Sequence, residues 1–462
     1  MIAPRVAFAV LGCKLNQYET DSLASRFRDG GYRVVPFDES ADVYVINSCT
    51  VTNQADRKSR NLVNRALRTA GGLGAATAGG GKGSGDRPAY RSPGPGSGDP
   101  LVVVTGCFAE ARREALEADG RTFVVGNDRK AHIFDLVEAA RRGEVLQPEA
   151  LPKALFDYEP PDRIFHTRSM VKIQDGCDNF CSFCIIPQVR GQATSRPAAD
   201  VLTDLRETVR RGAREVVLTG VNMSRYRDEG VNFSALIEEI LEIPGDFRLR
   251  ISSLEPDSLD ERFFAVLEHP KMCPHLHLCL QSGSERILLA MRRQYTVAEY
   301  LRAVGRIRSR IPDFNLTTDI IVGFPGETEA DFAESEAVVR EVGFSHVHTF
   351  RYSRRRGTRA DRMPGQVPEA VKAERSEGIR RLSEENKLVY RRRLIGRRQR
   401  VLLERVAEDG LSARGYGEHY APVELRAAAG WNPKLFRSNS FYNVVVDGIA
   451  EAEEPVLLGH PA

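Results

Sequence analysis

The sequence predicts an α/β protein in three parts: an N-terminal open parallel sheet, a central partial barrel of six strand–helix units, and a small C-terminal β-barrel. Short apolar strands alternate with amphipathic helices up to about residue 142, and the alternation resumes between residues 170 and 352. After residue 399 short β-rich stretches follow one another without such helices. Strand–helix alternation indicates parallel sheets, whereas closely spaced strands indicate a small antiparallel barrel.

The N-terminal domain is expected to span residues 1–143. Its helices are expected in the intervals between the strands, and its strands at 6–12, 32–37, 42–48, 101–106 and 122–127. The stretch 70–100 is rich in glycine, proline and serine and is predicted to be a disordered insertion, because it cannot bury enough apolar surface to offset its ordering entropy. A linker rich in proline and charge is expected at 144–164.

The central barrel is expected at residues 165–365, with chemistry at the carboxyl ends of its strands. A basic helical connector at 366–398 and the small barrel at 399–462 complete the predicted domain organisation. The six barrel strands are predicted at 170–176, 215–221, 247–255, 275–282, 315–324 and 346–352.

Composition limits the class of protein. The chain has 462 residues, too many for one ordinary core, and its 42% apolar and 28% charged residues are typical of a globular protein in water. No apolar run reaches the roughly eighteen residues needed to cross a bilayer, and the apolar stretch at 6–11 is too short for a secretion signal. We therefore expect a cytoplasmic protein without a membrane partner.

Three of the eight cysteines stand within eight residues: Cys177, Cys181 and Cys184 form the pattern C-x3-C-x2-C. Spacings this short exclude disulfides between them, which leaves zinc or an iron–sulfur cluster. Structural zinc takes four closed ligands, and no fourth cysteine or histidine lies nearby in the sequence. A four-iron cluster on three thiolates leaves one iron open to a ligand from outside the protein, which favours the cluster.

A second set of three cysteines is far apart in sequence but equivalent in position. Cys13, Cys49 and Cys107 each come directly after a predicted strand of the N-terminal sheet. The carboxyl ends of neighbouring parallel strands converge on one crevice, so the three thiols are expected to meet there. This set is again one ligand short of a closed site.

The cysteine motif after the first barrel strand, with Phe183 before its last cysteine, resembles that of the radical S-adenosylmethionine superfamily. The resemblance implies that the open iron chelates the methionyl group of S-adenosylmethionine, whose reductive cleavage gives a 5′-deoxyadenosyl radical. Cys177, Cys181 and Cys184 would then be catalytic. The stretch LTGVN matches the position of a superfamily motif that usually ends in glutamate, where this chain has Asn222. The residues implied to contact the cofactor are Phe183, Gly220, Asn222, Ser253, Glu255, Gln281 and Asp319.

The two cysteine sets and the terminal barrel together resemble the methylthiotransferases. That family resemblance implies two [4Fe-4S] clusters: one on Cys13, Cys49 and Cys107 that carries or supplies sulfur, and a radical cluster that activates the substrate. It also implies two uses of S-adenosylmethionine, as methyl donor and as radical source. The small barrel resembles the RNA-binding TRAM domain. Motifs such as LGCKLNQYETDSL and CTVTNQADRKSR are most similar to the branch that acts on threonylcarbamoyladenosine in tRNA.

The implied partners are the anticodon arm of tRNA, a reducing electron donor and a sulfur donor. Two arginine-rich runs, at 351–362 and 390–400, fit an anionic partner, and Arg391, Arg392 and Arg393 are the expected phosphate contacts. Tyr416, Tyr420 and Trp431 are expected either to stack on bases or to pack in the core of the small barrel.

Three alternatives remain open from the sequence. A methylthiotransferase could act on isopentenyladenosine in tRNA or on a ribosomal protein, and an iron–sulfur protein could bind RNA without catalysis. A zinc module is the third. Cys273 and Cys279 are assigned to no cluster: Cys279 is expected in the core of the strand at 275–282, and Cys273 lies in the turn before it. His275 and His277 could ligate a metal, but packing on the strand surface is the expected role.

Overall fold

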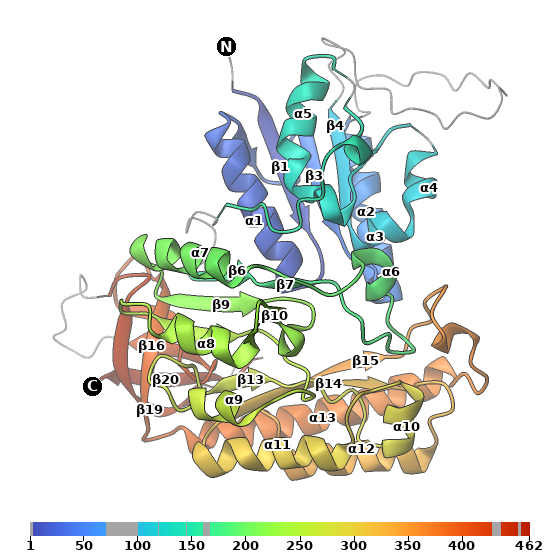
Figure 1. Ribbon diagram of the computed structural model, residues 1–462. Helices are drawn as coiled ribbons and strands as arrows, with labels where there is room; N and C mark the ends of the chain where they lie inside the picture. The colour runs from blue at the N-terminus through green and yellow to red at the C-terminus, as the bar shows by residue number, and fades with distance from the viewer. Residues whose placement is uncertain are drawn as a thin grey trace. The chain divides into compact units, whose positions relative to one another are not determined.

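The computed structural model in Figure 1 describes residues 3–70, 100–118, 120–144, 146–159, 167–426, 436–450 and 454–462. Most of the insertion expected at 70–100, and parts of the expected linker, lie outside these residues. No helix in the described ranges combines the length and apolarity that a bilayer crossing requires. The chain divides into two compact units. The first comprises Met1–Asp162, Asp175–Cys177 and Cys184–Gln192, and the second comprises the remaining residues.

A five-stranded parallel sheet forms the centre of the first unit, in the order β2-β1-β3-β4-β5. Its two central strands, β3 and β4, are buried along their whole length, as their runs of β-branched residues predict. The strands are β1 (Arg5–Val10), β2 (Arg33–Val35), β3 (Val43–Ser48), β4 (Leu101–Gly106) and β5 (Phe123–Val124). The predicted open parallel sheet is confirmed.

Helices cover both faces of this sheet (Figure 1). Helices α1 and α5 pack on one face through residues such as Phe27 and Leu136, and α2 packs on the other through Val63 and Ala66. Between β4 and β5, where the sequence predicts a helix, the described residues form two short helices, α3 and α4. The helices of the unit are α1 (Lys14–Asp29), α2 (Asn53–Ala70), α3 (Cys107–Ala111), α4 (Arg113–Glu117), η1 (Asn127–His132), α5 (Ile133–Arg141), η2 (Pro148–Ala150) and α6 (Ile186–Arg190).

Six parallel strands form the centre of the second unit. Hydrogen bonds join β6, β9 and β12 into one sheet and β13, β14 and β15 into another, and bridges such as Leu254–Leu278 join the end of β12 to the end of β13. The described residues show no pairing that closes β15 onto β6, so the barrel is partial, as predicted. The strands are β6 (Arg168–Lys172), β9 (Glu215–Thr219), β12 (Arg248–Ile251), β13 (His275–His277), β14 (Asn315–Val322) and β15 (His346–Arg351).

The helices between these strands begin at well-defined caps. Thr296 and Thr328 start α11 and α12 with capping boxes, in which the threonine and a following acidic residue satisfy each other's backbone N–H groups. The helices are α7 (Ala198–Arg210), α8 (Phe233–Leu241), α9 (Glu261–Val266), α10 (Glu285–Ala290), α11 (Val297–Arg310), α12 (Glu329–Val342) and α13 (Glu369–Arg393). Short 3₁₀ turns and two-residue strands complete the unit: β7 (Gln174–Asp175), β8 (Thr194–Ser195), η3 (Met223–Arg225), β10 (Arg227–Asp228), β11 (Val231–Asn232) and η4 (Ala360–Arg362).

The last strands close into a small barrel in the order β16-β17-β18-β20-β19. Four of the pairings are antiparallel, but β18 and β20 are parallel. A closed barrel with an odd number of strands cannot alternate direction all the way round, so the expected purely antiparallel barrel needs one such pair. The strands are β16 (Arg398–Val406), β17 (Ser412–Tyr416), β18 (Pro422–Arg426), β19 (Phe441–Ala450) and β20 (Val456–Pro461).

The small barrel packs against the residues that begin the strands of the partial barrel. Arg248, at the start of β12, donates to the carbonyl oxygens of Arg400 at 2.6 Å and Tyr416 at 3.0 Å. Asn315, at the start of β14, donates to the carbonyl oxygen of His419 at 2.6 Å. The small barrel therefore covers the amino ends of the strands, and their carboxyl ends are the ends that carry the expected chemistry.

Candidate active site

The structure brings Cys13, Cys49 and Cys107 together at the carboxyl edge of the N-terminal sheet. Cys13 caps α1 after β1, Cys49 follows β3, and Cys107 begins α3 directly after β4. Gly12 has φ +103°, and a Cβ atom there would lie 2.8 Å from the sulfur of Cys49, so the chain passes too close for a side chain. This glycine lets the thiol-bearing turns approach each other.

The three thiols are close enough to influence one another's ionisation. Burial, together with smaller contributions from negative charge at Cys107 and Cys13, raises the pKa of Cys49 to about 11. Burial also raises the pKa of Cys107, while the cations of Arg190 and Lys130 oppose that shift. Three converging thiols, two of them buried and one exposed, fit a four-iron cluster with one iron left open.

The loop that carries the second cysteine set turns sharply at Gly176. This glycine has φ +70°, and a Cβ there would lie 2.0 Å from the carbonyl oxygen of Gln192, so no other residue fits without moving the backbone. Cys177 follows, and its N–H donates to the carbonyl oxygen of Gly191 at 3.1 Å. The turn fixes the start of the three-cysteine loop within the first unit.

Cys181 lies in the second unit, where a buried arginine contacts its sulfur. Nη1 of Arg293 donates to Sγ of Cys181 at 3.1 Å, and the same guanidinium pairs with the carboxylate of Glu255. A buried cation beside a thiolate compensates its charge. The partly exposed thiols of Cys177, Cys181 and Cys184, and this charge-compensating contact, fit an iron–sulfur cluster that must admit an outside ligand.

The backbone after β9 is held by Gln174. Its side-chain oxygen accepts the N–H groups of Val221 at 2.9 Å and Asn222 at 2.7 Å. A Cβ on Gly220 would lie 2.7 Å from the Met223 side chain, so this turn requires a small residue. The side chain of Asn222 is buried and accepts the hydroxyl of Ser224 at 2.9 Å. Gly220 and Asn222 thus form a rigid strand end.

Three other expected cofactor residues lie on separate parts of the second unit. Phe183 packs edge-on against Phe324, with ring centroids 6.5 Å apart. Glu255 is the partner of Arg293 described above, and Ser253 is half-buried two residues before it, just after β12. Glu255 therefore joins the end of β12 to the contact at Cys181.

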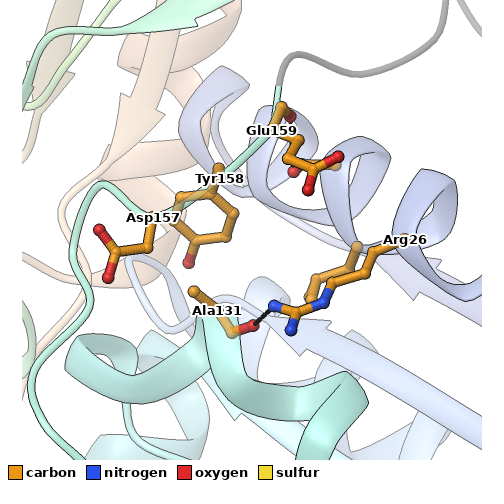
Figure 2. Close-up of a pocket in the computed structure, with 7 residues that line it drawn as sticks. Arg26, Ala131, Asp157, Tyr158 and Glu159 are labelled. Atoms are coloured by element: carbon orange, nitrogen blue, oxygen red, sulfur yellow. Dashed lines mark hydrogen bonds between the residues drawn. The ribbon is translucent and has the colours of Figure 1, made fainter. Parts of the chain in front are cut away.

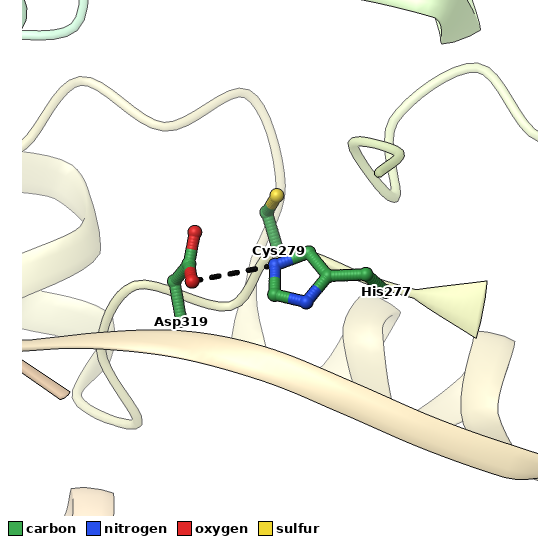
Figure 3. A group of neighbouring side chains, drawn as sticks. All are labelled: His277, Cys279 and Asp319. Carbon is green, nitrogen blue, oxygen red and sulfur yellow. Dashed lines mark ion pairs between the residues drawn. The ribbon is translucent and has the colours of Figure 1, made fainter. Parts of the chain in front are cut away.

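Gln281 and Asp319 lie on neighbouring chain segments. Gln281 adopts φ +70° and bridges to β14: its N–H donates to the carbonyl oxygen of Asp319 at 2.8 Å, and its carbonyl accepts the N–H of Ile321 at 2.9 Å. Figure 3 shows the Asp319 carboxylate directed at the His277 ring, with Nε2 and Oδ1 3.3 Å apart. Cys279 lies beside them, and one donor atom from each of the three residues falls within 4.8 Å of the others. His277, expected to pack on its strand, thus orients Asp319.

A separate small cavity lies in the first unit, beside α1 (Figure 2). Its volume of about 40 Å³ is enough for a few water molecules but not for a nucleoside. Arg26 lies beside it and donates to the carbonyl oxygen of Ala131 at 3.1 Å. None of the cysteines lines this cavity, whose lining residues are Ser22, Leu23, Arg26, Ala131, Asp157, Tyr158 and Glu159.

The three arginines expected to contact RNA differ in their exposure to solvent. Arg392 and Arg393, at the end of α13, are exposed, as are Arg397 and Arg398 just after it. Arg391 is buried, and its guanidinium lies 3.3 Å from the carboxylate of Glu454. This burial does not suit a phosphate contact, because α13 turns that side chain inward.

The aromatic residues of the small barrel are engaged within the protein. Tyr416 and Tyr420 stack on each other at 5.2 Å, and the guanidinium of Arg168 lies over both rings. Of the two roles expected from the sequence, this arrangement is packing. Trp431 lies outside the described residues.

Two groups of site residues escaped sequence reasoning. Arg293 contacts Cys181 from more than a hundred positions away, and nothing local in the sequence marks that contact. Arg190 forms a buried network in the first unit with Glu19, Lys130 and Asp175. The placement of Asp175 and Arg190 directly around the cysteine motif was the available signal for the second group.

Comparison with known proteins identifies the families to which the chain is similar. The model of the Radical SAM superfamily matches residues 171–338, and that of Uncharacterized protein family UPF0004 matches residues 5–79. The threonylcarbamoyladenosine tRNA methylthiotransferase MtaB of Thermotoga maritima is 35% identical over 423 residues, covering 91% of this chain and 91% of that protein. The protein of the same name from Bacillus subtilis is 34% identical over 475 residues, covering 96% and 98%.

Among solved structures, the radical S-adenosylmethionine methyltransferase TsrM of Kitasatospora setae, with cobalamin and a [4Fe-4S] cluster bound, matches with a TM-score of 0.53 and 15% identity. The match covers 78% of this chain and 74% of that one. At this identity the likeness concerns the fold.

Proposed function

This chain belongs to the threonylcarbamoyladenosine tRNA methylthiotransferase family, and we propose that it adds a methylthio group to C2 of N6-threonylcarbamoyladenosine next to the anticodon of tRNA. The observation that carries the proposal is the convergence of Cys13, Cys49 and Cys107 in a chain that also has the radical motif. The second three-thiol site gives the chain a centre, separate from the radical motif, that could supply the sulfur. The relatives favour neither the isopentenyladenosine nor the ribosomal-protein substrate, nor a protein without catalysis.

We assign one [4Fe-4S] cluster to each cysteine set, with S-adenosylmethionine on the open iron at Cys177, Cys181 and Cys184. When bound, these groups supply the sulfur, the methyl group and the organic radical that the reaction consumes. A radical is needed because the C2–H bond of adenine offers no acidity for a side-chain base to use. The protein supplies position and exclusion of water.

The residues of the second unit have distinct roles in this proposal. Arg293 holds Glu255 and compensates charge at Cys181, so it fixes the cofactor end of β12 relative to one cluster ligand. Gln174 fixes the turn at Gly220 and Asn222 through two backbone N–H groups. His277 orients the Asp319 carboxylate, which would accept hydrogen bonds from hydroxyl groups of the cofactor.

Exposed arginines at the end of α13 and the start of β16 would hold the RNA through its phosphates. The target base must leave its stack to reach the barrel, as enzymes that modify bases generally require. We also propose a cytoplasmic location, where tRNA, a low-potential electron donor and a sulfur donor are available together.

The test is mass analysis of tRNA nucleosides from cells that lack the gene. The 2-methylthio derivative of threonylcarbamoyladenosine should disappear, threonylcarbamoyladenosine itself should accumulate, and the intact gene should restore the product. A gene encoding Cys49→Ala should not restore it. Loss of methylthio-isopentenyladenosine instead, with the threonylcarbamoyl derivative unchanged, would assign the chain to the other substrate.

A further inference from the structure

Four buried charged side chains form a network beneath the first cysteine set. They are Glu19, Lys130, Asp175 and Arg190, each no more than 1% exposed at the side chain. Nζ of Lys130 lies 2.5 Å from Oε2 of Glu19, and Nη1 of Arg190 lies 2.9 Å from both carboxylate oxygens of Asp175 and 3.3 Å from Glu19. We call these four residues the charge network.

The charge network is tied to the turns that carry the cysteines through two asparagines. Nη2 of Arg190 donates to the side-chain oxygen of Asn16 at 2.6 Å, and the Asn16 amide donates to the carbonyl oxygens of Leu11 and Ser48. Leu11 lies two residues before Cys13, and Ser48 immediately precedes Cys49. Lys130 donates to the side-chain oxygen of Asn47 at 3.1 Å. A shift of Arg190 would therefore move the turns that carry Cys13 and Cys49.

Cys107, the third cysteine of the first set, contacts residues next to Arg190 in the sequence. Helix α6, which ends at Arg190, packs on α3 through Ile185 and Val189, which contact Cys107. The amide of Asn127 anchors the same helix by donating to the carbonyl oxygen of Val189 at 2.8 Å. Arg190 directly follows Val189 in this packing, and its positive charge opposes the rise that burial gives to the pKa of Cys107.

Stability does not explain this arrangement well. Buried ion pairs gain little over apolar residues of similar volume, because desolvating each charge costs several kcal/mol. The two cations and two carboxylates of the charge network cancel, and thiolates at the neighbouring site add negative charge beside them. Hydrogen bonds to sulfur and nearby charge are the features that set the reduction potential of an iron–sulfur cluster.

We propose that Arg190, assisted by Lys130, is a positioning residue for the N-terminal cluster: it holds the turns that carry Cys13 and Cys49, places its positive charge beside the Cys107 ligand, and raises the reduction potential of that cluster. The inference rests on the proposed function, because it requires a cluster on Cys13, Cys49 and Cys107. Arg190 stands six residues after Cys184, and its partner Asp175 stands two before Cys177. The segment that follows the second cysteine set thus supplies the arginine that tunes the cluster on the first set.

The test measures the potential of the first cluster alone. Full-length protein with Cys177→Ala, Cys181→Ala and Cys184→Ala, reconstituted anaerobically, is titrated by electron paramagnetic resonance with and without Arg190→Gln. At a fixed potential the ratio of reduced to oxidised cluster should fall at least about tenfold, which corresponds to 59 mV for one electron. Arg190→Lys keeps the charge and should stay within about threefold of the parent.

Arg26→Gln is the matched control, because Arg26 pairs with Asp135 at 2.8 Å in the same unit, away from the cysteines. Its potential should equal that of the parent. An unchanged potential in Arg190→Gln protein that retains its iron would overturn the inference. Where Arg190→Gln protein fails to fold, Lys130→Gln decides, with a lower potential expected and an unchanged one contradicting the proposal. A parent that binds no iron would overturn the cluster assignment itself.

Discussion

At the scale of single residues, the second unit uses buried charge to join its two barrels. Glu215, at the start of β9, is fully buried and accepts from Nε of Arg248 at 2.6 Å and Nε of Arg250 at 2.7 Å. Burial alone would raise the pKa of Glu215, but the two arginines hold it far below its ordinary range. Arg248 also donates to the small barrel, so this trio links the two barrels.

Replacing Glu215 by Gln should destabilise the second unit by about 3–5 kcal/mol, because two buried guanidinium groups are then without their counter-charge. Thermal unfolding of the intact protein should show a lower first transition. Glu207→Gln removes a partly exposed carboxylate paired with Arg210 and Arg211 and is the control, with an unchanged transition expected. Equal transitions for the two variants would show that the trio contributes nothing to the barrel junction.

His419 gives the same junction a dependence on pH. Its pKa is lowered to about 4, mainly by burial and also by the cations of Arg250 and Arg248, whereas the charge of Asp313 opposes this shift. Between pH 6.5 and 4 the unfolded chain takes up a proton that the folded chain refuses, so stability falls as the pH falls. His419→Gln should flatten that fall by up to about 1.4 kcal/mol per pH unit. Denaturant unfolding at several pH values measures the slope, and exposed His460→Gln should leave it unchanged.

At the scale of secondary-structure elements, the arginines at the end of α13 differ in exposure to solvent. Arg391 faces inward to Glu454, whereas Arg392 and Arg393 face solvent at the end of the helix. A run of consecutive arginines on a helix cannot present every side chain to one partner, because successive residues are about 100° apart. Only part of the run can therefore contact RNA.

Arg392→Gln with Arg393→Gln should weaken tRNA binding and make it less sensitive to salt. The slope of log affinity against log salt should become shallower by up to about 1 for each phosphate that these arginines neutralise. Binding measured at several salt concentrations gives the slope. Arg380→Gln with Arg381→Gln removes two exposed arginines from an earlier turn of the same helix and is the control. An identical slope in both pairs would make the end of α13 a solvated surface.

The elements that the sequence predicted well are those whose pattern is local. Strands such as β3 and β4 are continuous apolar runs, and Cys49 and Cys107 follow them directly, so the first cysteine site could be inferred from position alone. The contact of Arg293 with Cys181 could not, because it depends on how the chain after α10 returns to the barrel. Burial of Glu215 was equally hidden, since an acidic residue at a strand start normally indicates solvent.

At the scale of the whole molecule, the proposed function gives the two cysteine sets separate steps of one reaction. The first set and its charge network lie within the first unit, and the residues expected to hold the cofactor, including Glu255, Gln281 and Asp319, lie in the second. The loop from Cys177 to Cys184 belongs partly to each unit. Removing a cysteine from one set is therefore expected to abolish the step assigned to that set and to leave the step assigned to the other set intact.

Cys181→Ala should abolish 5′-deoxyadenosine formation while the first cluster remains at about four irons per chain. Iron analysis and product assays on the anaerobically reconstituted protein measure both. Retention of about eight irons, with full activity, would contradict the assignment of Cys181 as a ligand.

Cys49→Ala should give the reciprocal result: 5′-deoxyadenosine still forms on addition of S-adenosylmethionine and reductant, but no methylthio product appears on tRNA. Cys273→Ala is the matched control, because Cys273 is buried in the second unit and assigned to no cluster. Normal product from the Cys49→Ala protein would refute separate roles for the two sets.

Because the small barrel packs on the amino ends of the strands, a substrate that contacts both the small barrel and the carboxyl ends must have a minimum length. Strand β14 has eight residues, or about 26 Å at 3.3 Å per residue, between its amino end, which contacts the small barrel, and its carboxyl end, where the chemistry is proposed. A nucleic acid that touches both ends must bridge at least this distance. A free nucleoside cannot do so, so an oligonucleotide that reaches both ends must be several nucleotides long.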